Sequence, residues 1–197
     1  TVTLGLAWND TPAPSFLFCI RAMVQKSTTA WHSTGWQQLL SESITRQALG
    51  AHALQMDGAN VLQAAMKNKW AWINANRLKE HSDGTLARFC GDLEPLRTSD
   101  ATVLLDALNR WSLGVANALE NNEKSDPWSL VGWERVTRGV GLLIRFQTEF
   151  DLLESANDVW SMLFSSLATS RIDLLGEPEE GLQIMGLIES RALDFER

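Results

Sequence analysis

The sequence has no tyrosine, only two cysteines and only three histidines among its 197 residues, although it has nine tryptophans. Without tyrosine, no phenolic hydroxyl is available as a general acid or as a polar anchor of a binding site. Two cysteines in a chain of this size favour reduced, buried thiols over a disulfide. The histidines lie in separate segments, and none has a second ligand at i+3 or i+4, which excludes a metal-binding helix motif.

Long apolar stretches are also missing. No run of about 18 apolar residues, the length that crosses a bilayer as a helix, occurs in the sequence. The first nine residues have neither the basic nor the apolar region of a secretory signal. We therefore expect a soluble intracellular protein, in the cytoplasm or the nucleus.

The motifs of common catalytic sites are absent as well. The sequence has no glycine-rich phosphate loop, no Gly-x-Ser-x-Gly elbow and no Cys-x-x-Cys pair. The acidic residues near the end of the longest predicted helix lack the Glu-x-x-His partner of a di-metal bundle, so we interpret them as solvated surface. We expect a protein that is not an enzyme and that binds no metal and no cofactor.

The composition is that of a folded protein, but its charge is unevenly placed. Hydrophobic residues make up 45% of the chain and charged residues 21%, as in ordinary globular domains. Residues 1–100 carry 9 Lys or Arg and 8 Asp or Glu, whereas residues 101–197 carry 8 and 16, which gives a net charge of −7. The expected partner is another protein or a second copy of this chain, because this acidity does not support binding to nucleic acid or to a membrane surface.

Apolar residues recur at helical spacing through most of the chain, which predicts an all-α fold. The length favours a single helical domain over residues 1–197, with two helical subdomains, 15–94 and 100–197, as the alternative. About eight helices are predicted, over residues 15–25, 35–52, 60–79, 86–93, 101–120, 128–154, 159–175 and 181–195.

The longest helix is predicted over residues 128–154, and we expect the rest of the fold to pack around it. Asp126 suits the N-cap, and Pro127 suits the first helical position, where no backbone N–H is needed. Gly139 and Gly141 lie in its interior, where each costs about 1 kcal/mol relative to alanine. They indicate either a close approach by another helix or a local break.

An N-terminal arm and several tryptophans are the candidate interfaces. Residues 1–8 alternate as in a strand, but no second strand is evident, so we expect an extended arm. Trp8, Trp31 and Trp72 are the tryptophans that we expect to be exposed. Trp70 is a fourth candidate, because Trp70 and Trp72 would lie about 200° apart on a helix and cannot both face one core.

Two groups of basic residues are candidate anion-binding surfaces. The first group lies beside Trp70 and Trp72 and consists of Lys67, Lys69, Arg77 and Lys79. Basic side chains next to aromatic rings would suit single-stranded nucleic acid or an anionic membrane surface. The favoured interpretation of this stretch is nevertheless an ordinary amphipathic helix. The second group lies near one side of the predicted long helix and consists of Arg135, Arg138 and Arg145. The favoured interpretation is that Arg138 pairs with Glu134 and Arg145 with Glu149, both at i, i+4 spacing.

Two short stretches are similar to known families. The sequence Gly-Trp-Glu-Arg-Val at 132–136 resembles the Asn-Trp-Gly-Arg-Ile start of the central helix in Bcl-2 proteins, and Cys-Gly-Asp at 90–92 resembles the Gly-Asp of a BH3 helix. The resemblance implies a groove that receives a partner helix. The register departs from that family at Ala87, where a leucine is expected, and at Pro95, which interrupts the helix.

Residues 136–141 are similar to a Leu-Thr-Lys-Gly stretch of orthomyxovirus matrix proteins, which are all-helical shells. This similarity covers a handful of residues, and the acidic charge opposes it. Neither similarity assigns a family.

Three functions remain open. The first is a non-enzymatic protein that acts through its surfaces, by self-assembly as in a viral matrix or coat or by partner binding as in an adaptor. The second is a Bcl-2-like regulator whose groove lies between residues 86–93 and the long helix. The third is an all-α enzyme or small-ligand binder with a pocket between helices.

Overall fold

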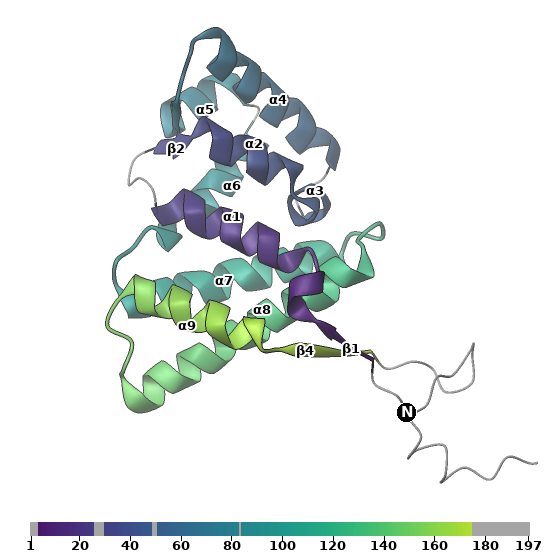
Figure 1. Cartoon of the computed structure of the whole chain (residues 1–197). Helices are drawn as coiled ribbons and strands as arrows, with labels where there is room; N and C mark the ends of the chain where they lie inside the picture. Colours follow the sequence, from purple (N-terminus) through teal and green to yellow (C-terminus); the bar gives the residue numbers. More distant parts are fainter. Residues whose placement is uncertain (1–3, 26–29, 49–50, 83, 175–197) are drawn as a thin grey trace, which may run out of the picture.

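A computed structural model describes residues 4–25, 30–48, 51–82 and 84–174 of the protein (Figure 1). Within these residues nearly all regular structure is helical, which confirms the all-α prediction. The α-helices are α1 (Ala13–Gln25), α2 (Ser33–Ser41), α3 (Ser43–Ala48), α4 (Ala51–Lys67), α5 (Ala75–His81), α6 (Thr85–Leu93), α7 (Ala101–Glu120), α8 (Pro127–Phe150) and α9 (Ala156–Ala168). The short elements are the 3-10 helices η1 (Trp8–Asp10) and η2 (Glu94–Leu96) and the strands β1 (Leu4–Ala7), β2 (Ala30–His32), β3 (Trp72–Asn74) and β4 (Arg171–Leu174).

The two longest of these helices, α7 and α8, pack against each other and against α9 in the lower part of Figure 1. Asp100 and Asp126 cap them by accepting hydrogen bonds from backbone N–H groups of the first turn, as their positions predict. α8 ends at Phe150, earlier than predicted, because Asp151 adopts a left-handed conformation with φ of 50°.

α1 crosses between this lower group and the group of α2 to α6, and it packs against α2, α3 and α8. Phe16 of α1 lies between Trp111 of α7 and Trp133 of α8, with ring centroids 5.8 and 5.3 Å away. The two indoles meet edge to face at 5.3 Å, and Trp133 donates its indole N–H to the Ser112 carbonyl at 2.9 Å. These aromatic side chains join three helices at the centre of the core.

Trp8 is part of the core, so its predicted exposure is wrong. β1 pairs antiparallel with β4, with Leu4 opposite Leu174. Trp8 is only 1% exposed, and its indole N–H donates to the Gly132 carbonyl at 3.1 Å. The alternation predicts an extended segment here but no strand to pair with it; that strand is β4, at the other end of the described chain, beyond the reach of local pattern.

The single helix predicted over residues 60–79 is wrong. α4 is followed by a turn at Lys69, whose φ of 55° is left-handed, and then by β3, which pairs with β2 so that Trp31 lies opposite Ile73. α5 begins afresh after Asn74, whose side chain accepts the Arg77 backbone N–H at 3.0 Å. β3 thus lies beside β2 and contacts α5, and α2 packs against α4.

Of three other predicted helices, two differ from the structure and one lies outside the described residues. The helix predicted over residues 35–52 is divided, because Glu42 has an extended backbone between α2 and α3. The helix predicted over 159–175 ends at Ala168, and β4 follows. The helix predicted over 181–195 lies outside the described residues.

The two glycines of α8 have different surroundings. A Cβ on Gly139 would lie 3.2 Å from Leu163 Cδ1 and 3.4 Å from Leu167 Cδ2 of α9, whereas a Cβ on Gly141 would meet nothing within 4 Å. The helix is continuous through both residues. Gly139 therefore serves a close helix approach, and neither glycine marks a break.

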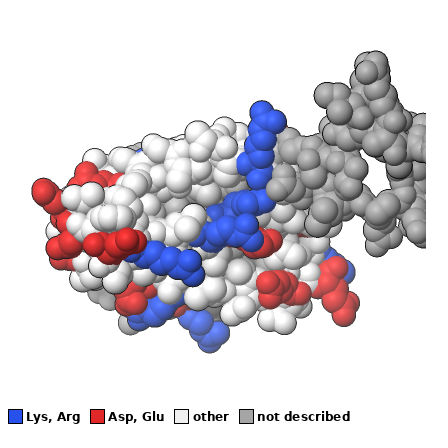
Figure 2. Space-filling model, turned by 90° about the horizontal axis from the view of Figure 1, so that it is seen from below, with Lys and Arg blue, Asp and Glu red and all other residues white. Residues whose placement is uncertain are grey.

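Charged side chains form several groups on the side of the molecule that carries α8 and α9. Figure 2 shows this side from below, with Asp and Glu at its left end and again at its lower right, and with Lys and Arg near its middle and along its lower edge. None of the helices in the described ranges has both the length and the apolar character needed to cross a membrane.

Candidate functional site

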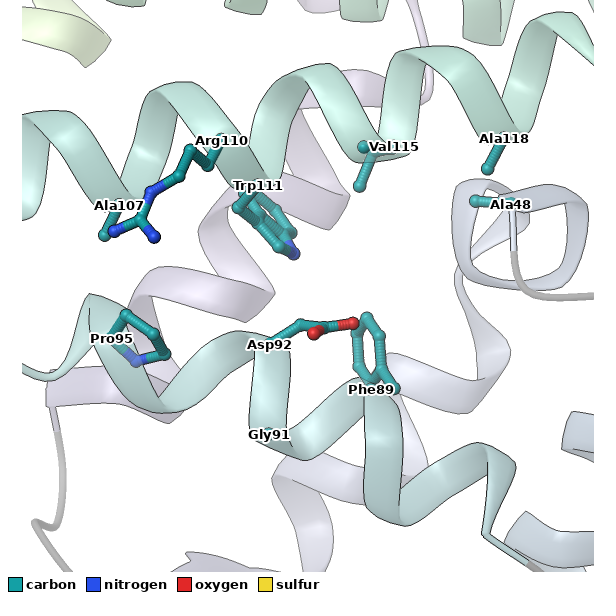
Figure 3. A pocket seen from close by; sticks show the side chains of 11 residues that line it. Ala48, Phe89, Gly91, Asp92, Pro95, Ala107, Arg110, Trp111, Val115 and Ala118 are labelled. Carbon is teal, nitrogen blue, oxygen red and sulfur yellow. The ribbon is translucent and has the colours of Figure 1, made fainter.

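A groove between α6 and α7 is the best candidate for a binding site. It has a volume of about 360 Å³, and its lining side chains come mostly from these two helices (Figure 3). Most of its lining is apolar or lacks a large side chain; the lining residues are Ala48, Phe89, Gly91, Asp92, Pro95, Ala107, Arg110, Trp111, Gly114, Val115 and Ala118.

Trp111 is the central aromatic residue of this groove. Its other contacts are with the aromatic rings of Phe16 and Trp133, which hold the indole in one orientation. In Figure 3 its ring nitrogen points into the groove. Among the described residues the Trp111 N–H has no hydrogen-bond acceptor, so an occupant of the groove can accept it.

Small residues follow one face of α7 beside this indole. Ala107, Gly114 and Ala118 are spaced at i, i+7 and i+11, and Gly91 lies across the groove on α6. A Cβ on Gly91 or Gly114 would meet nothing within 4 Å. Missing side chains, rather than bent helices, therefore create the open space.

Two charged side chains lie at the edges of the groove. Burial raises the pKa of the Asp92 carboxyl, and the nearby Arg88 opposes that shift with a smaller effect. Arg110, on α7, forms an ion pair with Asp106 at 3.0 Å, with both side chains well exposed. Exposed pairs of this kind contribute little, so Arg110 is available to an occupant. The groove thus combines an apolar floor with one acidic and one basic edge.

In comparisons with known proteins, no family model, no curated protein and no solved structure matches this chain significantly. The function of the groove therefore has to follow from its own residues and their arrangement.

Of the four tryptophans predicted as interfaces, two are buried. The prediction for Trp31 is wrong, as it is for Trp8: Trp31 is 2% exposed and packs edge to face on Trp36, with Arg97 over its other side. Trp70 is half-buried, and Trp72 is 41% exposed with its ring against His32. Of these four tryptophans only Trp72 is well exposed, and it lies outside the groove.

The basic residues near Trp72 do not form the continuous stripe that a single helix would give. Lys67 and Lys69 are exposed, but Arg77 donates to the Trp72 carbonyl at 2.6 Å and lies over the Trp70 ring at 4.4 Å. The side chain of Lys79 lies outside the description. Arg77 is thus engaged in holding the loop to α5, which weakens the case for a phosphate-binding surface there.

The arginines predicted as a stripe do share one side of α8. Arg138 pairs with Glu134 at 3.3 Å, as the i, i+4 spacing predicts, whereas no such ion pair joins Arg145 to Glu149 within the described chain. Arg135 is half-buried and Arg145 exposed. None of the three lines the groove.

The groove hypothesis identified one wall correctly. Residues 86–93 do form a wall, as α6, but the other wall is α7 and not the long helix, whose Trp133 is fully buried. Small residues on the same side of α7 as Trp111 are a signal in the sequence that would have indicated this wall. In the described chain no group of three or more His, Cys, Asp or Glu is placed to hold a metal ion.

Proposed function

We propose that this protein is a non-enzymatic binding protein whose α6–α7 groove receives an amphipathic helix of another protein. The observation that carries the proposal is an open, apolar groove along α7 with Trp111 at its centre, which no large side chain of the described residues fills. A helix laid in a groove is a common mode of peptide recognition.

The length of the groove supports a helix as the occupant. The lining residues of α7 run from Ala107 to Ala118, which corresponds to about 16 Å, or three turns, along the helix axis. Small residues on this face allow another backbone to approach to about 8 Å, the short end of helix packing distances. Large apolar side chains at i, i+4 and i+7 of the partner would then fill the space beside Trp111.

The charged edges restrict the sequence of that partner helix. A lysine or arginine of the partner can pair with Asp92, and an acidic residue can pair with Arg110, which lies on the opposite wall. Such pairs add orientation and specificity more than affinity. We therefore expect an apolar stripe with a cationic residue on one flank and an acidic residue on the other.

A small amphipathic ligand is the second candidate. The volume of about 360 Å³ lies at the lower end of small-molecule sites. The inward-pointing Trp111 N–H and the Asp92 carboxyl would supply the few polar contacts of such a site.

The test first selects peptide helices that bind the protein and then blocks the groove with a substitution. A display library of short amphipathic helices is selected on the full chain, and the affinity of the selected peptides is measured by calorimetry. Gly114→Leu should weaken binding by at least about tenfold, or 1.4 kcal/mol, because its side chain would occupy the groove. Gly141→Leu is the matched control, since its added Cβ also meets open space but lies on α8.

Asp92→Lys should select against peptides with a cationic flank and favour those with an acidic one. Peptides that bind wild type and Gly114→Leu equally would refute the groove as the site. If no helix is selected, but small apolar compounds quench tryptophan fluorescence in wild type and not in Gly114→Leu, the second candidate replaces the first.

A further inference from the structure

The α6–α7 groove has a candidate occupant in the sequence of this chain itself. The structure describes the chain as far as Leu174, and residues 175–197 follow β4 outside the described part. The sequence predicts a helix over residues 181–195, and we call these residues the C-terminal segment. Whether such a helix suits the groove depends on its apolar face, its length, its charges and its reach.

The predicted helix of the C-terminal segment has one apolar face. At 100° per residue, five apolar side chains fall within an arc of about 100°; they are Ile184, Met185, Ile188, Ala192 and Phe195. Leu193 lies about 140° from Ile188 and belongs to the other side of the helix. Isolated helices of about 15 residues are marginal in water, so this face gains most when a surface covers it.

The apolar face and the groove have the same length. Ile184 and Phe195 are eleven residues apart, which corresponds to about 16 Å of helix. The lining residues of α7 also extend over eleven residues, from Ala107 to Ala118. The large side chains of the segment therefore match the stretch of α7 on which large side chains are missing.

The charges beside the apolar face match the two edges of the groove. Arg191 lies about 60° from Ile188 on one flank of the face, and Glu189 lies about 100° from it on the other. The edges of the groove carry Asp92 on α6 and Arg110 on α7. When Arg191 faces the acidic edge, Glu189 faces the basic edge, so one orientation of the helix forms both pairs.

β4 and one end of the groove approach the same part of α8. Trp8, which directly follows the partner strand of β4, donates its indole N–H to the Gly132 carbonyl at 3.1 Å. One turn earlier on α8, Ser129 accepts a hydrogen bond at 3.1 Å from Gln47, the neighbour of the lining residue Ala48. Both β4 and α3 accordingly lie on the right of Figure 1. The ten residues from the end of β4 to the apolar face span up to about 33 Å when extended, which places the groove within reach.

From these matches we infer that the C-terminal segment docks as a helix in the α6–α7 groove of the same molecule. The inference rests on the proposed function, because it takes the groove to be a site for helices. A short tether gives an effective concentration of about 1 mM, so a segment with a Kd of about 0.1 mM fills the groove in about nine of ten molecules. A helix of another protein then has to displace the chain's own segment.

The first test measures this displacement in the full chain. Ile188→Asp places a charge at the centre of the apolar face and should release the groove. The helices selected from the library should then bind about tenfold more tightly, because the groove is free in every molecule rather than in about one of ten. Leu193→Asp is the matched control, since it adds the same charge to the other side of the segment, and it should leave the affinity unchanged. Unfolding cannot imitate this result, because it would weaken binding.

A synthetic peptide of residues 181–197 gives a second readout. Calorimetry should show that it binds the Ile188→Asp chain with a Kd of about 0.1 mM. Gly114→Leu, added to that chain, should weaken the peptide by at least about tenfold, because its side chain would occupy the groove. Arg191→Glu in the peptide should also weaken binding, and Asp92→Lys in the chain should restore it by reversing the pair.

The outcomes separate this inference from the proposed function. If Ile188→Asp and Leu193→Asp bind the selected helices equally well, the inference is wrong, and the proposed function stands as long as Gly114→Leu still weakens those helices. Selected helices that ignore Gly114→Leu would overturn both. If dilution of the wild-type chain tightens their binding as Ile188→Asp does, the segment comes from a second copy, which overturns docking within one molecule.

Discussion

Two glycines of α8 should respond in opposite ways to the same substitution. A Cβ on Gly132 would lie 2.8 Å from Thr11 Cβ and 3.2 Å from Ala13 Cβ, whereas a Cβ on Gly141 would lie in open space. Replacing a helical glycine by alanine gains about 1 kcal/mol of helix propensity. Gly141→Ala should therefore stabilise the protein by roughly 0.5 to 1 kcal/mol.

Gly132→Ala receives the same gain but has two costs. Overpacking against Thr11, which is buried and whose hydroxyl donates to the Trp8 carbonyl at 2.8 Å, costs typically 1–3 kcal/mol. Displacing this segment also strains the 3.1 Å hydrogen bond from Trp8 to the Gly132 carbonyl, and an unsatisfied buried donor costs about 1–3 kcal/mol. The net effect should be a destabilisation of about 1–5 kcal/mol, because the two costs together exceed the gain in helix propensity.

Urea unfolding followed by circular dichroism measures both effects. For a chain of this length each kcal/mol also shifts the melting temperature by about 2–4 °C, so the variants should melt on opposite sides of wild type. If Gly132→Ala is as stable as Gly141→Ala, the segment around Trp8 does not pack on α8 as described.

Four further substitutions test the core and the surface. Trp133→Phe removes the indole donor to the Ser112 carbonyl and should lower the free energy of unfolding by about 1–3 kcal/mol; an unchanged urea midpoint would contradict that hydrogen bond. Trp31→Ala should cost about 3–5 kcal/mol as a core truncation, whereas Trp72→Ala should stay within about 1 kcal/mol of wild type, so equal losses would refute the assigned burial. Burial, and to a lesser extent Glu42, raises the pKa of the Cys19 thiol to about 12. Because this thiol ionises first in the unfolded chain, stability should fall by up to about 1.4 kcal/mol per pH unit as the pH rises from about 9 towards 12. Cys19→Ala should remove that part of the slope.

The helices that the sequence predicts well are those with local signals at both ends. Asp100 and Asp126 each precede a long run of apolar residues at helical spacing, and both act as caps. The helix predicted over 60–79 failed because its apolar spacing continues through a turn at Lys69 and a strand. The Asn74 cap was a readable signal of a new start, but helical periodicity alone does not reveal a three-residue strand.

Burial of particular tryptophans could not be predicted from the sequence. Trp8 and Trp31 are covered by Gly132 and by Arg97, residues far from them in the chain. The same holds for the groove: residues 86–93 were predicted as one wall, but the α7 wall depends on how η2 turns the chain between α6 and α7. Tertiary placement of this kind is decided by the fold as a whole, because local propensity is a weak prior.

The pairing of β1 with β4 has a consequence for the order of folding. Leu4 and Leu174 are neighbours although the whole helical body lies between them in the sequence. Closing a loop of that length costs entropy that grows with the logarithm of its length, and a two-stranded ribbon alone is marginal in water. The ribbon should therefore form only after α1, α7, α8 and α9 have assembled and brought its strands together. Its hydrogen bonds should correspondingly be among the first to exchange with solvent, well before those of the long helices.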